Sequence, residues 1–398
     1  MSLANTTTQY GAVAKTFHWL TALGIAAVIP LGIIANDMPY DTAAQLADKA
    51  WLFSLHKTVG VSLFFVALAR IAWALSQPKP AAMHPDRKAE TLLAETVHWL
   101  LYGSLVLVPL SGWVHHAATE GFAPIWWPFG QTLPFVPKNV ALAEAFAGVH
   151  IVFERVLVVS LLLHIAGAVK HAVLDKDSTL ARMWFGTSRA TPDAAPHPHR
   201  RAALAAGAIW AMALGLGGVL GVYQHSSVAA AVALEDVESD WQVQDGTVAI
   251  TVRQMGSDVR GTFADWTAQI SFDETVTEGK AGEVTAEIAI GSISLGSVTA
   301  QALGADYFNA DAFPTATFAA DLRRADTGYV ADGTLTLKGV EQAVTLPFSL
   351  ALADGVATMQ GSTQLNRRAF GVGDSMTDES QLGFEVIVDI ALTAQRQS

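Results

Sequence analysis

Five separated apolar segments constrain this chain most, because each is long enough to cross a bilayer, which takes about 20 residues of helix. A helix satisfies all of its backbone hydrogen bonds within the segment, so it is the form in which such a segment crosses lipid. The sequence therefore predicts a multi-pass helical membrane region. Its spans are expected at residues 16–36, 52–75, 93–116, 146–172 and 202–222.

Basic residues gather in two of the connections between these spans. Residues 76–92 hold three Lys or Arg, residues 174–201 hold five, and the first connection holds three Asp and one Lys. Cytoplasmic loops carry an excess of Lys and Arg, so both basic connections and the N-terminus are expected in the cytoplasm. Five spans then place everything after residue 222 outside. This pattern is typical of a bacterial inner-membrane protein with a periplasmic C-terminal region.

The fifth span also has the three parts of a secretory signal peptide. The stretch "HRRAALAAGAIWAMALGLGGVLGVYQHSSVAAAVALED" has a basic start, an apolar run and an A-x-A-like ending. We interpret it as the signal of a once-secreted domain that is now fused behind a four-span protein. It acts either as a tether or as a cleavage site, with linkers expected at 186–201 and 223–237.

The two parts of the chain differ in net charge and in the pattern of apolar and polar residues. Residues 1–234 carry 15 Lys+Arg against 12 Asp+Glu, whereas residues 235–398 carry 9 against 24. An acidic domain of this kind argues against nucleic-acid binding. From about residue 238, eight short alternating runs separated by Gly and Asp predict an all-β antiparallel barrel or sandwich. Residues 296–312 have weaker strand character and are expected to hold a short helix.

Histidines in the first four spans are the candidate chemistry-bearing residues. His150 and His164 lie 14 residues apart, which places them on one helix face and about 21 Å apart along the axis. By depth, His56 matches His150 on the exterior side, and His18 matches His164 on the cytoplasmic side. Paired imidazoles at two depths predict two b-type haems, each with two axial histidines.

Other histidines are open to more than one interpretation. His98 could replace His18 as a ligand, or it could line a quinone or proton site, and His115 and His116 fit a solvated helix end. Zinc is the weaker alternative for the pairs, because a zinc site needs three or four ligands at one depth. The absence of cysteine excludes disulfides, Fe–S clusters, thiolate-ligated haem and c-type haem attachment.

The four membrane spans resemble the bacterial cytochrome b561 family of four-helix di-haem membrane cytochromes. The matching stretches are "FHWLTAL", "LHKTVGVSLFFVALARIAWAL", "HWLLYGSLVLVPLSGWV" and "GVHIVFERVLVVSLLLHIAGAVKHAVLDKDSTLARM", within residues 8–185. The resemblance implies His18 and His164 on one haem and His56 and His150 on the other. It also implies ubiquinone as a partner, with His171 near the quinone site.

Residues 238–396 resemble the YceI-like family, a lipocalin-like antiparallel barrel that binds polyisoprenoid lipids, including quinone-type lipids. The matching stretches are "VRGTFADWTAQISFD", "ADYFNADAFPTATF", "GTLTLKGVEQAVTLPF" and "LNRRAFGVG". Residues 299–303 read "TAQAL" where the family usually has an Arg-Asp-x-His-Leu stretch. The charged residues of that stretch, which would contact a polar head group, are therefore missing here. Five aromatic residues are candidates for lining a lipid tunnel: Tyr307, Phe308, Phe313, Phe318 and Phe370.

Two functions follow from these resemblances. Some cytochromes of the b561 family are superoxide oxidases, which pass an electron from exterior superoxide through the haems to ubiquinone. Exterior lysines such as Lys57 or Lys138 would attract superoxide. Other four-span cytochromes relay electrons for a partner dehydrogenase, and the barrel would then be a non-enzymatic lipid carrier. The haem ligands alone do not distinguish the two.

Overall fold

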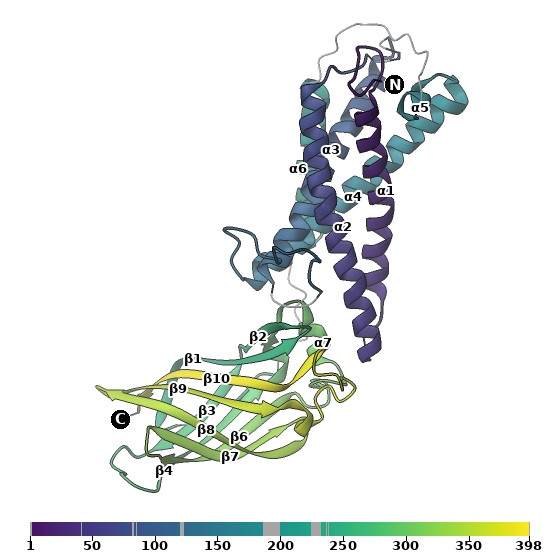
Figure 1. Ribbon diagram of the computed structural model, residues 1–398. Coiled ribbons are helices and arrows are strands. Elements are labelled where there is room, and N and C mark those ends of the chain that lie inside the picture. The colour runs from purple at the N-terminus through teal and green to yellow at the C-terminus, as the bar shows by residue number, and fades with distance from the viewer. Residues whose placement is uncertain are drawn as a thin grey trace. The chain divides into compact units, whose positions relative to one another are not determined.

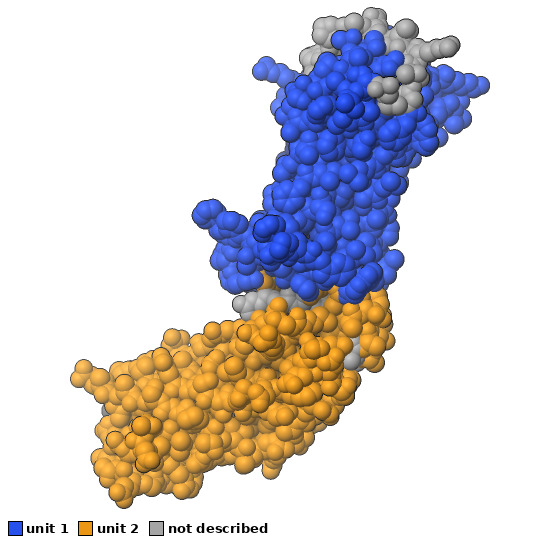
Figure 2. Space-filling model, viewed as in Figure 1, with its two compact units in different colours: residues 1–37, 51–118, 124–225 blue, residues 38–50, 119–123, 226–398 orange. Residues whose placement is uncertain are grey.

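A computed structural model describes residues 2–40, 42–81, 83–84, 86–119, 123–185, 200–223, 232–235, 237 and 239–397. Its contacts divide the chain into two compact units, residues 1–37, 51–118 and 124–225 and residues 38–50, 119–123 and 226–398 (Figure 2). The A-x-A-like ending of the fifth span lies largely outside the described residues, as do most of the two linkers expected around that span.

Long helices that run side by side dominate the first part of the chain (Figure 1). Five of them are long and apolar enough to cross a membrane, which confirms the five expected spans. A sixth, α5 (Thr179–Met183), is a short helix that follows α4. The five long helices are α1 (Ala12–Asp37), α2 (Ala43–Ser76), α3 (Lys88–Ala118), α4 (Val140–Lys170) and α6 (Arg200–Val219).

The outer faces of these helices are apolar. Leu23, Leu75, Leu162 and Leu204 are 67, 84, 61 and 74% exposed. A soluble monomer rarely exposes so much contiguous apolar surface, whereas lipid tails solvate it. The protein is therefore a membrane protein.

The two ends of α4 show how local sequence sets a helix boundary. The side chain of Asn139 caps the N-terminus by accepting a hydrogen bond from Leu142 N at 2.8 Å. At the other end, one turn of π-helix covers His171–Asp175, and Lys176 ends it in the left-handed conformation with φ 53°. Such π-helical turns are frequent at functional sites.

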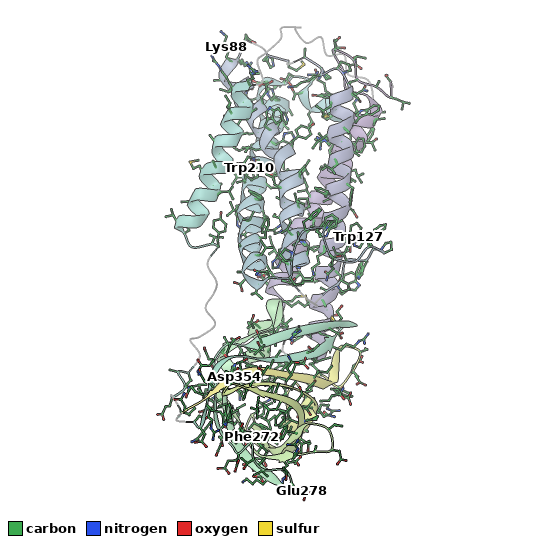
Figure 3. All side chains as sticks on the ribbon, turned by 90° about the vertical axis from the view of Figure 1, so that its left-hand side faces the viewer. Lys88, Trp127, Trp210, Phe272, Glu278 and Asp354 are labelled. Carbon is green, nitrogen blue, oxygen red and sulfur yellow. The ribbon has the colours of Figure 1, made fainter. Side chains whose placement is uncertain are left out.

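The fifth span, α6, packs against the helices before it. Trp210 points from α6 toward the bundle (Figure 3), and its ring centroid lies 4.9 Å from that of Phe153 on α4. A Cβ atom added to Gly103 on α3 would lie 3.2 Å from Trp210 Nε1, so a residue without a side chain makes room for the indole. α6 is thus an integral part of this helical unit.

The second part of the chain is one curled antiparallel sheet in the order β3-β4-β6-β7-β8-β9-β10-β1-β2-β5 (Figure 1). The first five strands in sequence are β1 (Trp241–Gln254), β2 (Ser257–Phe263), β3 (Trp266–Phe272), β4 (Lys280–Ala289) and β5 (Ile293–Ser294). The others are β6 (Thr315–Arg324), β7 (Tyr329–Leu337), β8 (Val340–Ala353), β9 (Val356–Asn366) and β10 (Leu382–Arg396). The expected helix within 296–312 is present as α7 (Thr299–Leu303).

The sequence predicts eight strands and the structure has ten. The run 259–273 is two strands, because the chain turns at Ala264–Asp265, where both backbone N–H groups donate to Ser292. β3 then forms one edge of the sheet while β2 pairs with the two-residue strand β5 near the other edge. Curling brings β3 toward β1, where Ser239 Oγ bonds both the N–H and the carbonyl of Ile270 at 2.7 and 3.1 Å.

Candidate functional site

His56 on α2 and His150 on α4 form the first candidate pair. Their ring centroids lie 6.4 Å apart with the planes at 85°. His56 Nδ1 lies 2.9 Å from the carbonyl oxygen of Val28, and His150 Nδ1 lies 2.8 Å from that of Val108. Each carbonyl accepts the Nδ1 proton, so Nε2 is the unprotonated nitrogen that can bind a metal.

Two glycines make these contacts possible. Gly32 follows Val28 by four residues, and Gly112 follows Val108 by four. A Cβ atom added to Gly32 would lie 2.8 Å from His56 Cε1, and one added to Gly112 would lie 3.0 Å from His150 Cε1. Any larger residue would therefore push the imidazole away from the carbonyl that orients it.

This arrangement follows an internal repeat that the sequence predictions above missed. The interval from His18 to Gly32 is 14 residues, and so is that from His98 to Gly112. The stretches "VIPLG" (28–32) and "VPLSG" (108–112) then stand at matching places in two helical hairpins, α1–α2 and α3–α4. The equal 14-residue intervals from histidine to glycine could have revealed this repeat in the sequence.

Three histidines gather at the second depth. The ring centroid of His164 lies 6.2 Å from that of His18, with the planes at 61°, and 5.2 Å from that of His98, with the planes at 64°. Arg70 lies in the same region, with its guanidinium 5.1 Å from the ring centre of Tyr102. The structure thus brings His98 beside the pair predicted from depth. His115 instead bonds the carbonyl of Ala143 through Nδ1 at 2.7 Å, and its ring lies 4.6 Å from that of His116.

Beyond α4, His171 belongs to a hydrogen-bonded ionic network. Asp177 Oδ2 lies 2.7 Å from His171 Nδ1 and 2.9 Å from His84 Nε2. Glu90 Oε1 lies 3.1 Å from His171 Nε2. Burial raises the pKa of Asp177, but hydrogen bonds from Thr179, His84 and His171 lower it by more, so the pKa lies well below its ordinary value.

Four side chains of this network have the composition of a metal site. His84, His171, Asp175 and Asp177 each bring one ligand atom within 4.8 Å of the others, and no other such group occurs among the described residues. However, Lys170 Nζ lies 2.7 Å from Asp175 Oδ2, and Arg87 lies 3.1 Å from it. These cations already neutralise the carboxylate, so the group is better described as an ion-pair network than as a cation site.

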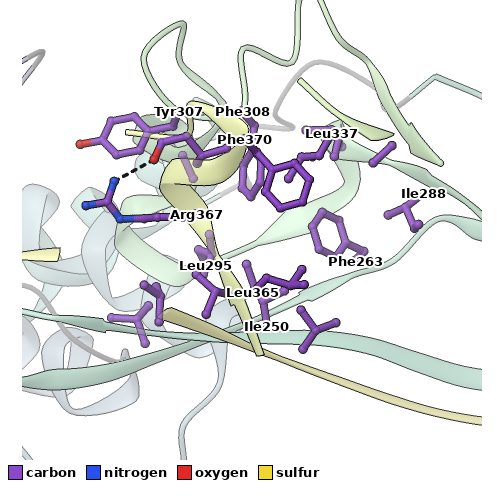
Figure 4. A pocket seen from close by; sticks show the side chains of 18 of the residues that line it. Ile250, Phe263, Ile288, Leu295, Tyr307, Phe308, Leu337, Leu365, Arg367 and Phe370 are labelled. Atoms are coloured by element: carbon purple, nitrogen blue, oxygen red, sulfur yellow. Dashed lines mark hydrogen bonds between the residues drawn. The ribbon is translucent and has the colours of Figure 1, made fainter. Parts of the chain in front are cut away.

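The barrel contains two apolar cavities, each of about 180 Å³. They share five lining residues, so they lie next to each other inside the barrel, with Tyr307 and Arg367 at one end of the first cavity (Figure 4). Apolar cavities of this size in proteins stay dry and bind apolar molecules. The shared residues are Val248, Ile288, Leu335, Leu365 and Val388.

Four of the five aromatic candidates line these cavities. Tyr307, Phe308 and Phe370 line the first cavity and Phe318 lines the second. Phe313 lines neither. It lies instead against the turn between β7 and β8, where a Cβ atom added to Gly339 would be 2.8 Å from the Phe313 ring. Alternation along a strand cannot place Phe313, because it precedes β6 in a loop.

Arg367 was missed as a key residue of the barrel, although it stands in the motif "LNRRAFGVG". It is 4% exposed, and burial lowers its pKa. All five of its N–H groups donate to main-chain carbonyl oxygens, at 2.5–3.1 Å. The acceptors are Val372, Gly373, Met376, Leu382 and Gly383.

Comparison with known proteins identifies the family of the helical part of the chain. The family model of the prokaryotic cytochrome b561 matches residues 9–186. Cytochrome b561 homolog 2 of Escherichia coli is 30% identical over 188 residues, which cover 46% of this chain and 95% of that relative. The chain belongs to the cytochrome b561 family. Probable superoxide oxidase CybB of Yersinia pestis is 25% identical, over 44% of this chain and 95% of that relative.

Behind the cytochrome b561 domain, residues 225–394 match the family model of the YceI-like domain. The crystal structure of Burkholderia cenocepacia BcnA is 30% identical, covers 38% of this chain and 96% of that chain, and has a TM-score of 0.36. That of the Campylobacter jejuni YCEI protein is 20% identical, covers 44% of this chain and 98% of that chain, and has a TM-score of 0.33. The match to the family model identifies the barrel as a YceI-like domain, which follows the cytochrome b561 domain in this chain.

The cytochrome b561 family implies haem b, and the histidine geometry can be tested against it. If two imidazoles bound one haem iron, each iron–nitrogen bond would be about 2 Å long and each ring centre would lie about 1 Å beyond its nitrogen. The two ring centres would then be about 6 Å apart. His56 with His150, at 6.4 Å, and His18 with His164, at 6.2 Å, fit this spacing. His98 with His164, at 5.2 Å, is closer than this spacing.

Proposed function

We propose that this protein is a membrane di-haem b-type cytochrome that transfers electrons from superoxide on the exterior side to ubiquinone. The proposal rests on the two histidine pairs of the cytochrome b561 domain. Each pair has the spacing of two axial imidazoles, and His150 and His164 lie about 21 Å apart along α4. We assign His56 and His150 to the outer haem and His18 and His164 to the inner one.

Haem iron with two imidazole ligands accepts and releases one electron and leaves no position open to oxygen. The residues around it then have defined tasks. Val28 and Val108 hold His56 and His150 as the Nδ1–H tautomer. Lys138, an exposed residue of the loop before α4, would supply positive charge on the side where an anionic donor would approach, whereas Lys57, which adjoins His56 in sequence, is only 6% exposed.

The reaction balances as two superoxide ions, one ubiquinone and two protons giving two molecules of oxygen and one ubiquinol. Reduction of ubiquinone therefore needs protons as well as electrons. The network of His84, His171 and Asp177 supports a quinone site at the end of α4, because hydrogen-bonded imidazoles can deliver protons. We assign His171 to that site.

For the barrel we propose binding of an isoprenoid lipid tail, including that of a quinone. Cavities cost stability, at about 24 cal/mol per Å³, so each cavity of about 180 Å³ would cost roughly 4 kcal/mol if empty. That is a large share of the roughly 5–15 kcal/mol that stabilises a typical domain. An elongated apolar ligand would offset this cost by filling both cavities.

We place the protein in the bacterial inner membrane, with the N-terminus in the cytoplasm and the barrel in the periplasm. The support is the excess of Lys and Arg in residues 76–92 and 174–201 together with the odd number of spans. We take residues 8–185 as the cytochrome domain, 202–222 as the tethering helix and 238–396 as the barrel.

A stopped-flow experiment tests the electron donor. Superoxide pulses mixed with the oxidised, purified full-length protein should reduce the haems, and added ubiquinone should reoxidise them with release of oxygen. The variant His56→Ala should lose the superoxide response. Haems that stay oxidised after superoxide but are reduced by a co-purified dehydrogenase would instead support the relay subunit with a lipid-carrier barrel.

A further inference from the structure

Gln254 is a polar residue in an otherwise apolar row of the barrel interior. Alternate residues of β1 face inward, and Val248, Ile250, Val252 and Gln254 all line the first cavity. Gln254 is 5% exposed. β1 ends there because Met255 and Gly256 have φ of 48° and 81°, the two left-handed residues of a tight hairpin turn to β2.

The side-chain oxygen of Gln254 has no hydrogen-bond partner within the described part of the chain. A buried polar atom without a partner costs about 1–3 kcal/mol, so such atoms are rare and call for an explanation. Because Gln254 lines the first cavity, a polar group of a bound ligand can reach this atom and supply its hydrogen bond.

The neighbours of Gln254 decide the charge of that group. Gln254 pairs with Leu382 of β10, whose carbonyl accepts from Arg367 at 3.1 Å, so Arg367 lies at the same end of the cavity. Arg367 has no N–H group left for a ligand, because main-chain carbonyls accept all five. One N–H group of Gln301 Nε2 donates to Tyr307 Oη, at 2.7 Å.

This end of the cavity therefore offers an acceptor and no cationic donor. A phosphate or diphosphate would lose its hydration and gain no cationic donor in return. A hydroxyl group loses little on burial once it donates to a carbonyl oxygen.

We propose that the first cavity binds a neutral prenyl lipid whose hydroxyl group donates to Gln254 Oε1, and that it discriminates against the phosphate ester of the same lipid. This rests on the proposed function of the barrel as a prenyl-lipid site. Two sources share the chemistry: a polyprenyl alcohol, and the phenolic hydroxyl of ubiquinol, the product proposed for the cytochrome domain.

Competition binding on the delipidated full-length protein in nanodiscs tests this proposal, with tritiated farnesol as the probe and protein-free nanodiscs as the blank. Farnesol should displace the probe about tenfold better than farnesyl methyl ether, which cannot donate, or farnesyl phosphate. Gln254→Met should remove the preference for the alcohol over the ether. Gln360→Met, on an exposed residue of β9, should keep it.

The outcomes separate the head-group inference from the proposed function. If farnesyl phosphate competes as well as farnesol, or if Gln254→Met keeps the preference for the alcohol, the head-group inference is wrong while the prenyl-lipid site stands. If none of the probes binds, both are wrong. The binding of ubiquinol and of ubiquinone with the same tail, each measured in wild type and in Gln254→Met, distinguishes the two sources. Only ubiquinol carries the hydroxyl group, so only its binding should weaken in Gln254→Met if ubiquinol is the source.

Discussion

His56 Nδ1 lies 2.9 Å from the main-chain carbonyl oxygen of Val28, across the interface between α2 and α1. The contact exists because Gly32, one helical turn further along α1, has no side chain to obstruct the imidazole. His150 repeats the arrangement with Val108 and Gly112. The orientation of each proposed ligand thus depends on a glycine in a different helix.

Replacing these glycines should loosen the outer haem. In Gly32→Ala or Gly112→Ala the new methyl group displaces the imidazole from its carbonyl partner, and loss of such an orienting contact typically lowers metal affinity about 10- to 100-fold. Haem retained per chain after incubation with excess apomyoglobin, measured as the pyridine haemochrome, should fall from two toward one. The remaining haem should be the inner one.

Gly215→Ala on α6 is the matched control for this test. A Cβ atom added there meets nothing within 4 Å, so this variant should retain both haems. Equal retention in Gly32→Ala and Gly215→Ala would show that Val28 does not orient His56.

Single-histidine variants should identify the ligands. His56→Ala and His164→Ala should each remove one haem, because each deletes one axial nitrogen of a different pair. His98→Ala should keep two haems, because the ring of His98 lies closer to that of His164 than the spacing of two axial imidazoles. The number of haems per chain in each variant shows which histidines are ligands. Loss of a haem in His98→Ala together with full content in His18→Ala would reverse the assignment of the inner ligands.

Asp177→Asn should destabilise the end of α4 in a pH-dependent way. The pKa of Asp177 is lowered in the folded protein, so its carboxylate stabilises the fold above its unfolded pKa of about 4, and this contribution is lost as pH falls toward the folded pKa. The melting temperature of the variant should therefore lie below that of wild type at pH 7. The gap should close as the pH falls below about 4.

Asp86→Asn, an exposed residue of the same region, controls for the charge change and should melt like wild type at every pH. A gap between wild type and Asp177→Asn that grows as the pH falls below about 4 would contradict the assigned direction of the pKa.

Arg367→Met should destabilise the barrel by at least about 3 kcal/mol, because it leaves several buried carbonyl groups without donors. Urea unfolding followed by tryptophan fluorescence should show an earlier barrel transition, while the haem absorbance, which reports on the membrane domain, should not shift. Arg368→Met changes the neighbouring, exposed arginine and should have little effect. Wild-type stability in Arg367→Met would leave Arg367 open to a ligand-binding role.

The barrel should remain joined to the fifth helix, α6, without cleavage between them. Trp210 packs on Gly103 and Phe153, so cleavage after α6 would separate the barrel from a helix that belongs to the bundle. In membrane extracts, an antibody against the barrel should detect one chain that also contains the helical unit. A periplasmic fragment that begins near residue 232 would show that the signal-like segment is still cleaved.

Much of this organisation is local in the sequence and was predictable for that reason. A bilayer selects apolar helices of sufficient length, so composition alone located the five spans. A helix has a constant rise, so the 14-residue interval between His150 and His164 placed them at two depths. Period-two alternation likewise located the strands, and the weaker pattern in 296–312 located α7.

Contacts between distant segments could not be predicted from local patterns. The sequence treats 259–273 as one run, but only the curled sheet sends β2 and β3 toward opposite edges. The motif that contains Arg367 was visible, yet only the folded loop shows that carbonyl groups accept all five of its N–H groups. His18 and His98 are equivalent in the repeat, and only helix packing sets one of them at 6.2 Å from His164 and the other at 5.2 Å.

The sequence by itself therefore determined the membrane spans, the depths of the histidines and the β character of the second part of the chain, because these depend on hydropathy and on the repeat of one element. Only the tertiary structure decided that Val28 and Gly32 orient His56, and that Gln254 ends an apolar row as an unpaired acceptor. Such relationships depend on the packing of segments that are far apart in the chain.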